Sequence, residues 1–370
     1  MDPRVLKAML PYFVHRFGNA ASFTHSFGRD ADEKVRQARG EIARLIGAQA
    51  RDIVFTSGAT ESNNLALKGV AEAYRGRGDH FISTVVEHRS VLDPLKRLSQ
   101  NGFRVTLLPV GRDGIVDVSD VRKAVTPKTI LISVMAANNE TGAIQPVAEI
   151  ARIAKKKGIL FHSDATQAAG KLPIDVRKTG IDLLSFTAHK IYGPKGVGAL
   201  YVRKTEPRVN LVPILDGGGH ETGLRSGTLN VPGIVGFAKA CEICRKTLKA
   251  ESRRTAALRD RFGKLLREAV PDLVMNGPRH KRLPNNLNLS FPGVEARALM
   301  QALPELAFSS GSACTSTSLE ASYVLKAMGV PEPLRRSSVR FGLGRFNTER
   351  DIRRAAGRIA EAVKKIRGVI

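Results

Sequence analysis

Seven short apolar runs recur between residues 52 and 203, and most are separated by longer amphipathic stretches. In order, the runs are DIVFTS, HFISTVV, RVTLLPV, ILISVM, ILFHSD, LLSFTA and GALYVR. β-Branched residues are frequent in them, which is typical of buried strands, and the longer stretches have the length of helices. Strands that alternate with helices usually form a mostly parallel sheet, because the helices supply the crossover connections. The pattern therefore predicts an α/β fold with a mostly parallel seven-stranded sheet.

The rest of the chain predicts a second, smaller α/β domain. A helical region from Ile234 to Val270 is followed by the strand-like runs PNNLNLSF and SSVRFGLG and by a basic C-terminal helix. A chain of 370 residues also exceeds what one hydrophobic core usually serves. We expect a large domain over residues 15–250 and a small domain made of residues 1–14 and 251–370, which carries the run SSGSACTS.

Polar clusters directly follow five of the predicted strands. They are SGATESNN, EHRS, NNETG, DATQ and AHK. Ligands of parallel sheets bind beyond the carboxyl ends of the strands. Each cluster alone would serve as a turn, but five of them at strand ends predict one binding site.

One of these clusters contains Lys190, which lies within SFTAHKIYGPKG just past an apolar run. The glycines and the proline after it restrict the backbone. An amine at this place could form a Schiff base with an aldehyde cofactor, and burial would lower its pKa. For the lysine alone, a solvated charge at the rim of the sheet is the alternative.

The other strand-end residues fit pyridoxal phosphate as that aldehyde. Asp164 ends a run with the character of a central strand, where the protonated ring nitrogen of the cofactor would supply a cation for it, although it could instead cap the next helix. Gly58 precedes a predicted helix N-terminus, which favours an anion such as the cofactor phosphate. Capping of that helix by Thr60 or Ser57 is compatible with this interpretation. His88 could lie over a planar cofactor.

The chain has three cysteines, and they fall into two settings. Cys314 lies in SSGSACTS, which has the composition of a loop, and reactive cysteines are typically partly exposed, so we predict a nucleophilic thiol. Thr317 and Glu320 have capping-box spacing, and the helix expected after them would place its positive end near that thiol. Cys241 and Cys244 form a CxxC without a second pair, so we interpret them as packed thiols and expect no metal site.

The net charge of +25 would attract nucleic acid, anionic lipid or an acidic protein. The basic residues are spread over helical segments without interleaved aromatics, so solvated helix faces and an RNA or acidic-protein surface both stay open. Three cysteines cannot form a disulfide framework, no run reaches the ~20 apolar residues of a membrane span, and the N-terminus does not resemble a signal peptide. We expect a cytoplasmic protein without a membrane partner.

The sequence resembles the cysteine desulfurases, which are class-V aminotransferase-like pyridoxal phosphate enzymes of fold-type I, and in particular the group with the SSGSACTS loop. The resemblance covers nearly the whole chain and rests on TSGATESNN, NNETG, DATQ, HKIYGPKGVGALYVR, GGGHETGLRSGT, SSGSACTS and SVRFGLGRFNTE in the order of the family. It implies that Lys190 binds the cofactor aldehyde and that His88 stacks on the ring and moves protons. The resemblance also implies that Asp164 contacts the pyridine nitrogen and that Gln167 contacts the ring hydroxyl oxygen. It implies that the phosphate is held by Ala59, Thr60, Thr187 and His189 of the same chain and by Thr228 of the partner subunit. The substrate carboxylate, by the same resemblance, is bound by Asn139 and Arg340.

By the same resemblance, the implied activity converts L-cysteine to L-alanine and leaves a persulfide on Cys314. The implied partners are a second copy of the chain, an acceptor such as an iron–sulfur scaffold or a tRNA-thiolation enzyme, and tRNA by contact. Selenocysteine lyase or cysteine sulfinate desulfinase activity on the same scaffold is one alternative. A catalytically impaired basic binding protein is the other.

The chain departs from the family at its start. The family normally carries a strand and a loop of the form LDxxATTP before the residues that match Asp2 to Val5, and here Met1 stands in that place. We expect a start site that was assigned too late. A genuinely shortened chain would bind substrate weakly and keep its cofactor.

Overall fold

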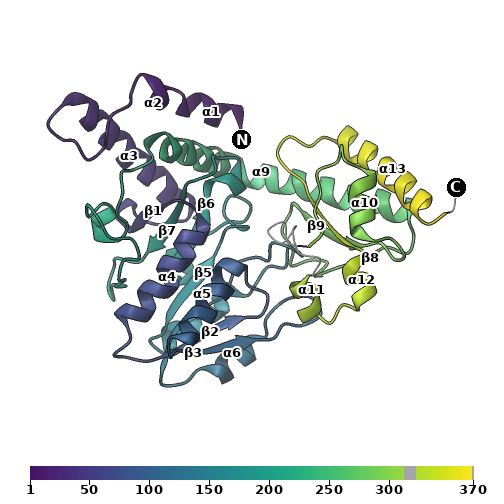
Figure 1. Ribbon diagram of the computed structural model, residues 1–370, viewed down its shortest axis with the longest axis horizontal. Coiled ribbons are helices and arrows are strands. Elements are labelled where there is room, and N and C mark those ends of the chain that lie inside the picture. The colour runs from purple at the N-terminus through teal and green to yellow at the C-terminus, as the bar shows by residue number, and fades with distance from the viewer. Residues whose placement is uncertain (312–321, 369–370) are drawn as a thin grey trace. The chain divides into compact units, whose positions relative to one another are not determined.

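A computed structural model of the chain describes residues 1–311 and 322–368 (Figure 1). The elements and their bounds are α1 (Pro3–Met9), α2 (Pro11–Val14), α3 (Ser26–Leu45), η1 (Ala50–Asp52), β1 (Ile53–Thr56), α4 (Ala59–Ala73), β2 (His80–Thr84), α5 (Arg89–Gln100), β3 (Arg104–Leu108), α6 (Val118–Ala124), β4 (Thr129–Ser133), α7 (Val147–Lys156), β5 (Leu160–Asp164), α8 (Val176–Thr179), β6 (Leu183–Thr187), η2 (Ala188–Ile191), β7 (Gly198–Val202), η3 (Glu221–Gly223), α9 (Val231–Ala269), β8 (Val274–Met275), β9 (Asn286–Ser290), α10 (Ala296–Ala302), α11 (Tyr323–Ala327), α12 (Glu332–Arg336), β10 (Ser338–Gly342) and α13 (Glu349–Ile366). No helix in these described ranges is long and apolar enough to cross a lipid bilayer.

The chain divides into two compact units, and each is formed by segments that are far apart in the sequence. Unit 1 consists of Met1–Leu108, Val118–Ala136 and Pro146–Leu248. Unit 2 consists of Pro109–Asp117, Ala137–Gln145 and Lys249–Ile370. The division after Leu248 falls within the long helix α9.

All seven predicted strands are present in unit 1, and they form one sheet with the order β1-β7-β6-β5-β4-β2-β3. The pairs β3/β2, β2/β4, β4/β5 and β5/β6 are parallel, whereas β7 is antiparallel to both of its neighbours. The predicted α/β fold with a mostly parallel sheet is therefore confirmed. The carboxyl ends of β2, β4, β5 and β6 meet at the same edge of this sheet.

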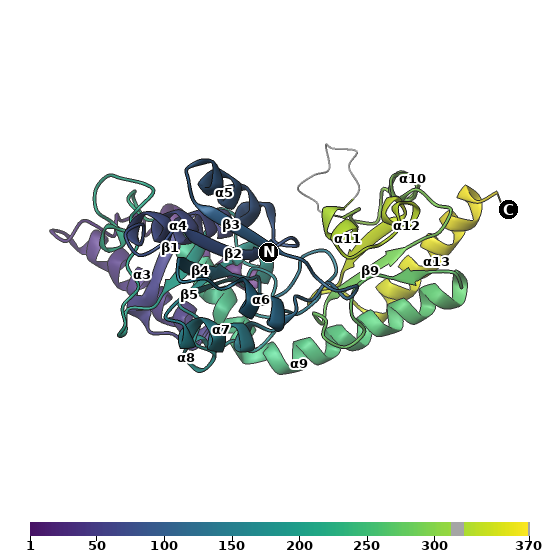
Figure 2. The same ribbon diagram turned by 90° about the horizontal axis from the view of Figure 1, so that it is seen from below.

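Helices on both faces of the sheet explain why its strands are so apolar. Every residue of β2, β4, β6 and β7 is buried. Figure 2 shows α5 on one face of the sheet and α7 and α8 on the other. Leu65 of α4 and Leu95 of α5 share one hydrophobic cluster with Phe81 and Leu183 of the sheet. Burial of each such side chain stabilises the unit by about 1.5–3 kcal/mol.

Residues 1–14, which the sequence analysis assigns to the small domain, group here with unit 1. The backbone N–H of Asp2 donates to the carbonyl of Tyr192 at 2.9 Å. Met9 is buried, and a Cβ added to Gly236 of α9 would lie 2.4 Å from its sulfur. This glycine therefore lets the backbone of α9 approach the side chain of Met9 closely.

Unit 2 contains an antiparallel sheet of three strands in the order β10-β9-β8. The helix α13 begins at a capping box in which Thr348 and Asp351 each bind the other's backbone N–H. One cluster of buried residues holds Phe291 and Phe341 of the strand region together with Ile359 of α13. The core of unit 2 is thus built mainly by the last 120 or so residues of the chain.

Candidate active site

The N-terminus of α4, at the end of β1, has the features of an anion site. The helix begins at Ala59 after Gly58, and no side chain among the described residues caps it, so the alternative of a cap by Thr60 or Ser57 does not hold. The first amides of a helix have no intrahelical acceptor and favour negative charge. Among the described residues, a Cβ added to Gly58 would meet only Oγ1 of Thr187 within 4 Å, at 3.9 Å. The described residues therefore leave room beside the first turn.

Thr187 and His189 lie at the same place, at the end of β6. The Thr187 hydroxyl donates to the carbonyl of Val197 at 3.1 Å, and its oxygen lies 3.0 Å from Nδ1 of His189. A hydroxyl has one proton to donate, so Nδ1 of His189 is the donor in the second contact. Burial and the charges of three nearby lysines lower the pKa of His189. A surplus of positive charge at this end of the sheet suits a phosphate.

Asp164, at the end of β5, is connected to His88 by hydrogen bonds through Asn63 and Ser90. The amide nitrogen of Asn63 donates to Oδ2 of Asp164 and to Oγ of Ser90, at 2.8 Å each. The Ser90 oxygen lies 2.8 Å from Nδ1 of His88, and the Ser90 N–H donates to the same ring nitrogen at 3.1 Å. Since Nδ1 accepts these bonds, neutral His88 carries its proton on Nε2.

Asn63 and Ser90 lie in the clusters SGATESNN and EHRS that predict a binding site, but no role in the site was predicted for either residue. Both side chains are buried. The available signal was the position of Asn63, which lies on the face of α4 that also carries Leu67 and Val70. A polar residue on an apolar helix face needs a partner, and here that partner is Asp164.

The surroundings of Asp164 test whether the residues present fit pyridoxal phosphate. Its side chain is 5% exposed, and its hydrogen-bond partners within the described ranges are neutral, namely the Asn63 amide and the Thr166 N–H. The residues after it form turns rather than a helix, so the helix-cap alternative does not hold. A buried carboxylate without a cation is costly, and a protonated ring nitrogen would supply the missing charge. The residues fit the cofactor.

Lys190 lies in η2 within electrostatic reach of His88 and His189. Burial lowers the pKa of His88, the charge of Asp164 opposes this shift, and the charge of Lys190 adds to it. Lys190 itself is exposed in the single chain. Gln167 is half-buried in the turn after β5, three residues beyond Asp164.

Thr228 lies in the segment GGGHETGLRSGT, which is anchored at two points in unit 1. The buried carboxylate of Glu221 accepts two hydrogen bonds from Arg39, at 2.6 and 2.7 Å. Nε of Arg225 donates to Glu61 in the first turn of α4 at 2.8 Å. Thr228 is exposed, and within the described part of the chain no hydrogen bond ties it to the other predicted site residues.

Unit 2 holds the two residues predicted for the substrate carboxylate. Arg340 lies in β10, and its Nη1 donates to the carbonyl of Asn139 at 2.8 Å. The side-chain oxygen of Asn139 is buried without a hydrogen-bond partner among the described residues. Cys314 lies outside the described residues. The structure thus brings Asn139 and Arg340 together in unit 2, and it collects most of the predicted cofactor residues at one edge of the sheet in unit 1.

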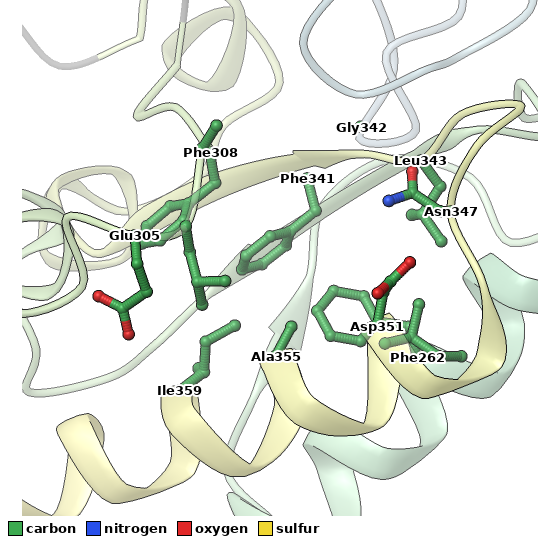
Figure 3. Close-up of a pocket in the computed structure, with 13 residues that line it drawn as sticks. Phe262, Glu305, Phe308, Phe341, Gly342, Leu343, Asn347, Asp351, Ala355 and Ile359 are labelled. Atoms are coloured by element: carbon green, nitrogen blue, oxygen red, sulfur yellow. The ribbon is translucent and has the colours of Figure 1, made fainter.

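A separate cavity of about 250 Å³ in unit 2 has a different character. Figure 3 shows Phe308 and Phe341 on one side of it and Ala355 and Ile359 of α13 on the other. Among the described residues that line it there is no lysine, arginine or histidine. It therefore offers neither an amine for an aldehyde nor a cation for a carboxylate, and it is not the predicted site.

A buried acid next to this site, Glu87, gives a prediction for stability. Burial raises the pKa of Glu87 to about 8, and the charge of Asp164 contributes to the shift. In the folded chain, Glu87 therefore keeps a proton that it loses in the unfolded chain above its usual pKa of 4.5. The free energy of unfolding falls as the pH rises from 4.5 to about 8. We expect Glu87→Gln to abolish this loss, which is at most about 1.4 kcal/mol per pH unit.

Urea unfolding of both proteins at about pH 5, 6.5 and 8 measures the effect. The advantage of the variant should grow with pH, because its amide oxygen still accepts the Met135 N–H but cannot ionise. Replacement of the exposed Glu72 by glutamine is the matched control and should leave the pH dependence unchanged. Parallel curves for Glu87→Gln and the wild type would show that Glu87 is already ionised in the folded protein.

Comparison with known proteins is consistent with this chemistry. The family model "Aminotransferase class-V" matches residues 1–355. The chain is 56% identical over 367 residues to a cysteine desulfurase IscS of Anaeromyxobacter dehalogenans, which covers 99% of this chain and 91% of that protein. An IscS of Rickettsia bellii is 51% identical over 367 residues, with 99% and 89% covered. A solved NifS-like protein matches with a TM-score of 0.92 at 38% identity, over 99% of this chain and 96% of that chain. The chain belongs to the class-V aminotransferase family, and within it to the pyridoxal phosphate-dependent cysteine desulfurases.

Proposed function

We propose that this enzyme removes sulfur from L-cysteine, releases L-alanine and keeps the sulfur as a persulfide on Cys314. The observation that supports the proposal most strongly is the hydrogen-bonded chain from the buried Asp164 to His88, with Lys190 in electrostatic reach. A carboxylate that needs a cation and a neutral histidine beside an amine are the groups that a pyridoxal phosphate reaction at an amino acid requires.

In this proposal, each site residue of unit 1 has one role. Lys190 would hold the cofactor aldehyde, and Asp164 would hold its ring nitrogen. Gln167 would contact the ring hydroxyl. The phosphate would be held by Ala59 and Thr60 in the first turn of α4, by Thr187 and His189, and by the partner subunit's Thr228. When bound, the cofactor supplies an electron sink for the charge that develops at the substrate. His88 has Nδ1 occupied by Ser90, so Nε2 is the atom at which it would exchange a proton.

At the substrate, Arg340 would bind the carboxylate through two parallel N–H groups, and the amide of Asn139 would add a third donor. The Cys314 thiolate would attack the substrate sulfur. The bond between that sulfur and the substrate Cβ breaks, its electron pair stays with Cβ, and Cβ takes a proton to become the methyl group of alanine. One thiol and one cysteine thus give one alanine and one persulfide.

The first test is the visible absorption spectrum of the purified protein, followed by an assay of alanine and sulfide with free cysteine and a reductant. We expect a yellow protein that makes alanine and sulfide in equal amounts. A yellow protein that is inactive with cysteine but degrades selenocysteine or cysteine sulfinate would favour those activities instead. A colourless protein that binds tRNA with steep salt dependence would favour the impaired binding protein.

We also propose a homodimer, as a composite site with Thr228 requires. Large apolar side chains are exposed in the N-terminal part of unit 1, and a surface of this kind usually marks an interface. They are Leu6, Leu10, Phe13, Val14, Phe17, Phe23 and Phe27. The sulfur would pass to an acceptor protein in the cytoplasm, such as an iron–sulfur scaffold or a tRNA-thiolation enzyme, and the charge of +25 would allow contact with tRNA.

A further inference from the structure

Glu140 is a buried carboxyl group of unit 2 that the proposed reaction does not use. It is fully buried in the turn that also carries Asn139. Its backbone N–H donates to the side chain of Asn138 at 2.8 Å, and its carbonyl accepts the amide groups of Asn286 and Asn288 from β9 at 3.2 Å each. These contacts fix the backbone of Glu140 against β9, and with it the direction of the side chain.

The carboxyl group of Glu140 is hydrogen-bonded to Ser322, on one side of the segment 312–321, and lies near Gly311, on the other side. The hydroxyl of Ser322 donates to its Oε2 at 2.5 Å and accepts the N–H of Leu325 at 3.1 Å, as the cap of α11. A Cβ added to Gly311 would lie 3.5 Å from the same Oε2 and 3.4 Å from Cβ of Ser322. Gly311 and Ser322 are therefore close to each other beside the carboxyl group of Glu140.

The same assembly includes the arginine proposed to bind the substrate. The backbone N–H of Arg340 donates to the carbonyl of Ser309 at 2.7 Å, and the N–H of Ser309 donates back at 3.2 Å. Its side chain donates to the carbonyl of Asn139. Burial raises the pKa of Glu140, while the Ser322 hydrogen bond and the charge of Arg340 oppose the shift. Arg340 thus acts electrostatically on the same carboxyl group to which Ser322 donates.

We propose that Glu140 is a positioning residue for sulfur transfer, which holds the attachment points of the segment that carries Cys314 in a fixed relation to Arg340. This inference rests on the proposed function, because it assumes that Arg340 binds the substrate and that Cys314 accepts its sulfur. The consequence is that substrate binding and sulfur transfer depend on different contacts. Loss of the link between Glu140 and Ser322 should slow transfer to the thiol and leave binding of cysteine nearly unchanged.

The experiment uses the cofactor-loaded full chain with three substitutions of Ser322. Ser322→Ala removes both the donor to Glu140 and the helix cap. Ser322→Gly is well tolerated at an N-cap but has no hydroxyl to donate to Glu140, and Ser322→Thr keeps both functions. The matched control is Ser337→Ala, which removes another buried serine hydroxyl of unit 2, one that bonds the carbonyl of Leu334.

Two quantities are measured for each protein. Spectral titration gives the affinity for L-cysteine, and rapid-quench mass spectrometry gives the rate at which the first persulfide forms on Cys314. For Ser322→Ala and Ser322→Gly we expect affinity within about twofold of the wild type and persulfide formation slowed about tenfold, equivalent to about 1.4 kcal/mol. Ser322→Thr and Ser337→Ala should behave as the wild type does.

Wild-type persulfide rates in Ser322→Gly would overturn the inference, because they would show that the link between residue 322 and Glu140 is not needed for transfer. The inference would also be wrong if the affinity for cysteine and the rate of persulfide formation fell together, or if Ser337→Ala slowed persulfide formation as much as Ser322→Ala does. A wild-type protein that turns over cysteine without any persulfide on Cys314 is a distinct result. It would refute the proposed function itself, whatever the Ser322 variants do.

Discussion

Replacement of Lys190 by alanine is expected to reduce turnover of cysteine by about 10⁴-fold or more, as removal of a central catalytic group typically does. The lysine follows the end of β6, between the cluster of Thr187 and His189 and the restricted backbone of GPKG. A methyl group cannot bind an aldehyde covalently. The variant should therefore lose the yellow colour on dialysis, which a visible spectrum before and after dialysis will show, alongside an assay of alanine.

Lys195 provides the matched control for this substitution. It is an exposed lysine of the same loop, and its charge also acts on His189. Lys195→Ala removes a positive charge near the phosphate end but leaves the proposed amine in place. It should keep its colour and most of its activity. Retention of colour and turnover by Lys190→Ala would mean that the cofactor is held by another group.

Replacement of Cys314 by alanine should abolish persulfide formation and sulfide release from cysteine. An unperturbed thiol of pKa about 8.5 is only a few per cent thiolate at neutral pH, but no other group among the proposed residues can take up sulfur. Binding of cysteine should persist, because Arg340 and the cofactor residues are unchanged. Mass spectrometry of the protein after a single turnover and an assay of sulfide check both parts of the expectation.

Cys241→Ala is the control for this second experiment. Cys241 and Cys244 are packed in α9, with 0% and 2% of their surfaces exposed, as expected from the sequence. Burial raises the pKa of Cys241 well above its usual range, so it is a poor nucleophile. The control should form persulfide normally. Continued sulfide release from cysteine by Cys314→Ala would overturn the proposed mechanism, and retained activity with selenocysteine alone would favour the lyase alternative.

The strands and the positions directly after them could be predicted from the sequence, because both depend on short-range pattern. Asp164 and Thr187 lie where apolar runs end, and the structure places both at the end of a strand. Contacts between segments that are far apart in the sequence leave no such short-range pattern. The bond from Asn63 to Asp164 spans 101 positions, and the link from Glu140 to Ser322 spans 182.

Helix boundaries were also harder to predict than strands. The capping-box spacing of Thr317 and Glu320 predicts a helix after them, whereas the described helix α11 begins at Tyr323 with Ser322 as its cap. The predicted cap residues Thr317 and Glu320 lie outside the described residues. A serine can cap a helix almost anywhere, and here its second contact, with Glu140, comes from a turn that the local sequence does not reveal.

The composition of unit 2 from three separate segments has a consequence for synthesis of the chain. Residues 109–117 and 137–145 leave the ribosome about a hundred residues before residue 249, where the main part of their unit begins. At about 5–20 residues per second, roughly 5–20 s pass before synthesis reaches the main part of unit 2. The turn with Asn139 and Glu140 lacks β9 and β10 throughout that interval. The proposed carboxylate-binding pair of Asn139 and Arg340 therefore forms only near the end of translation, after all strands of the unit 1 sheet have been synthesised.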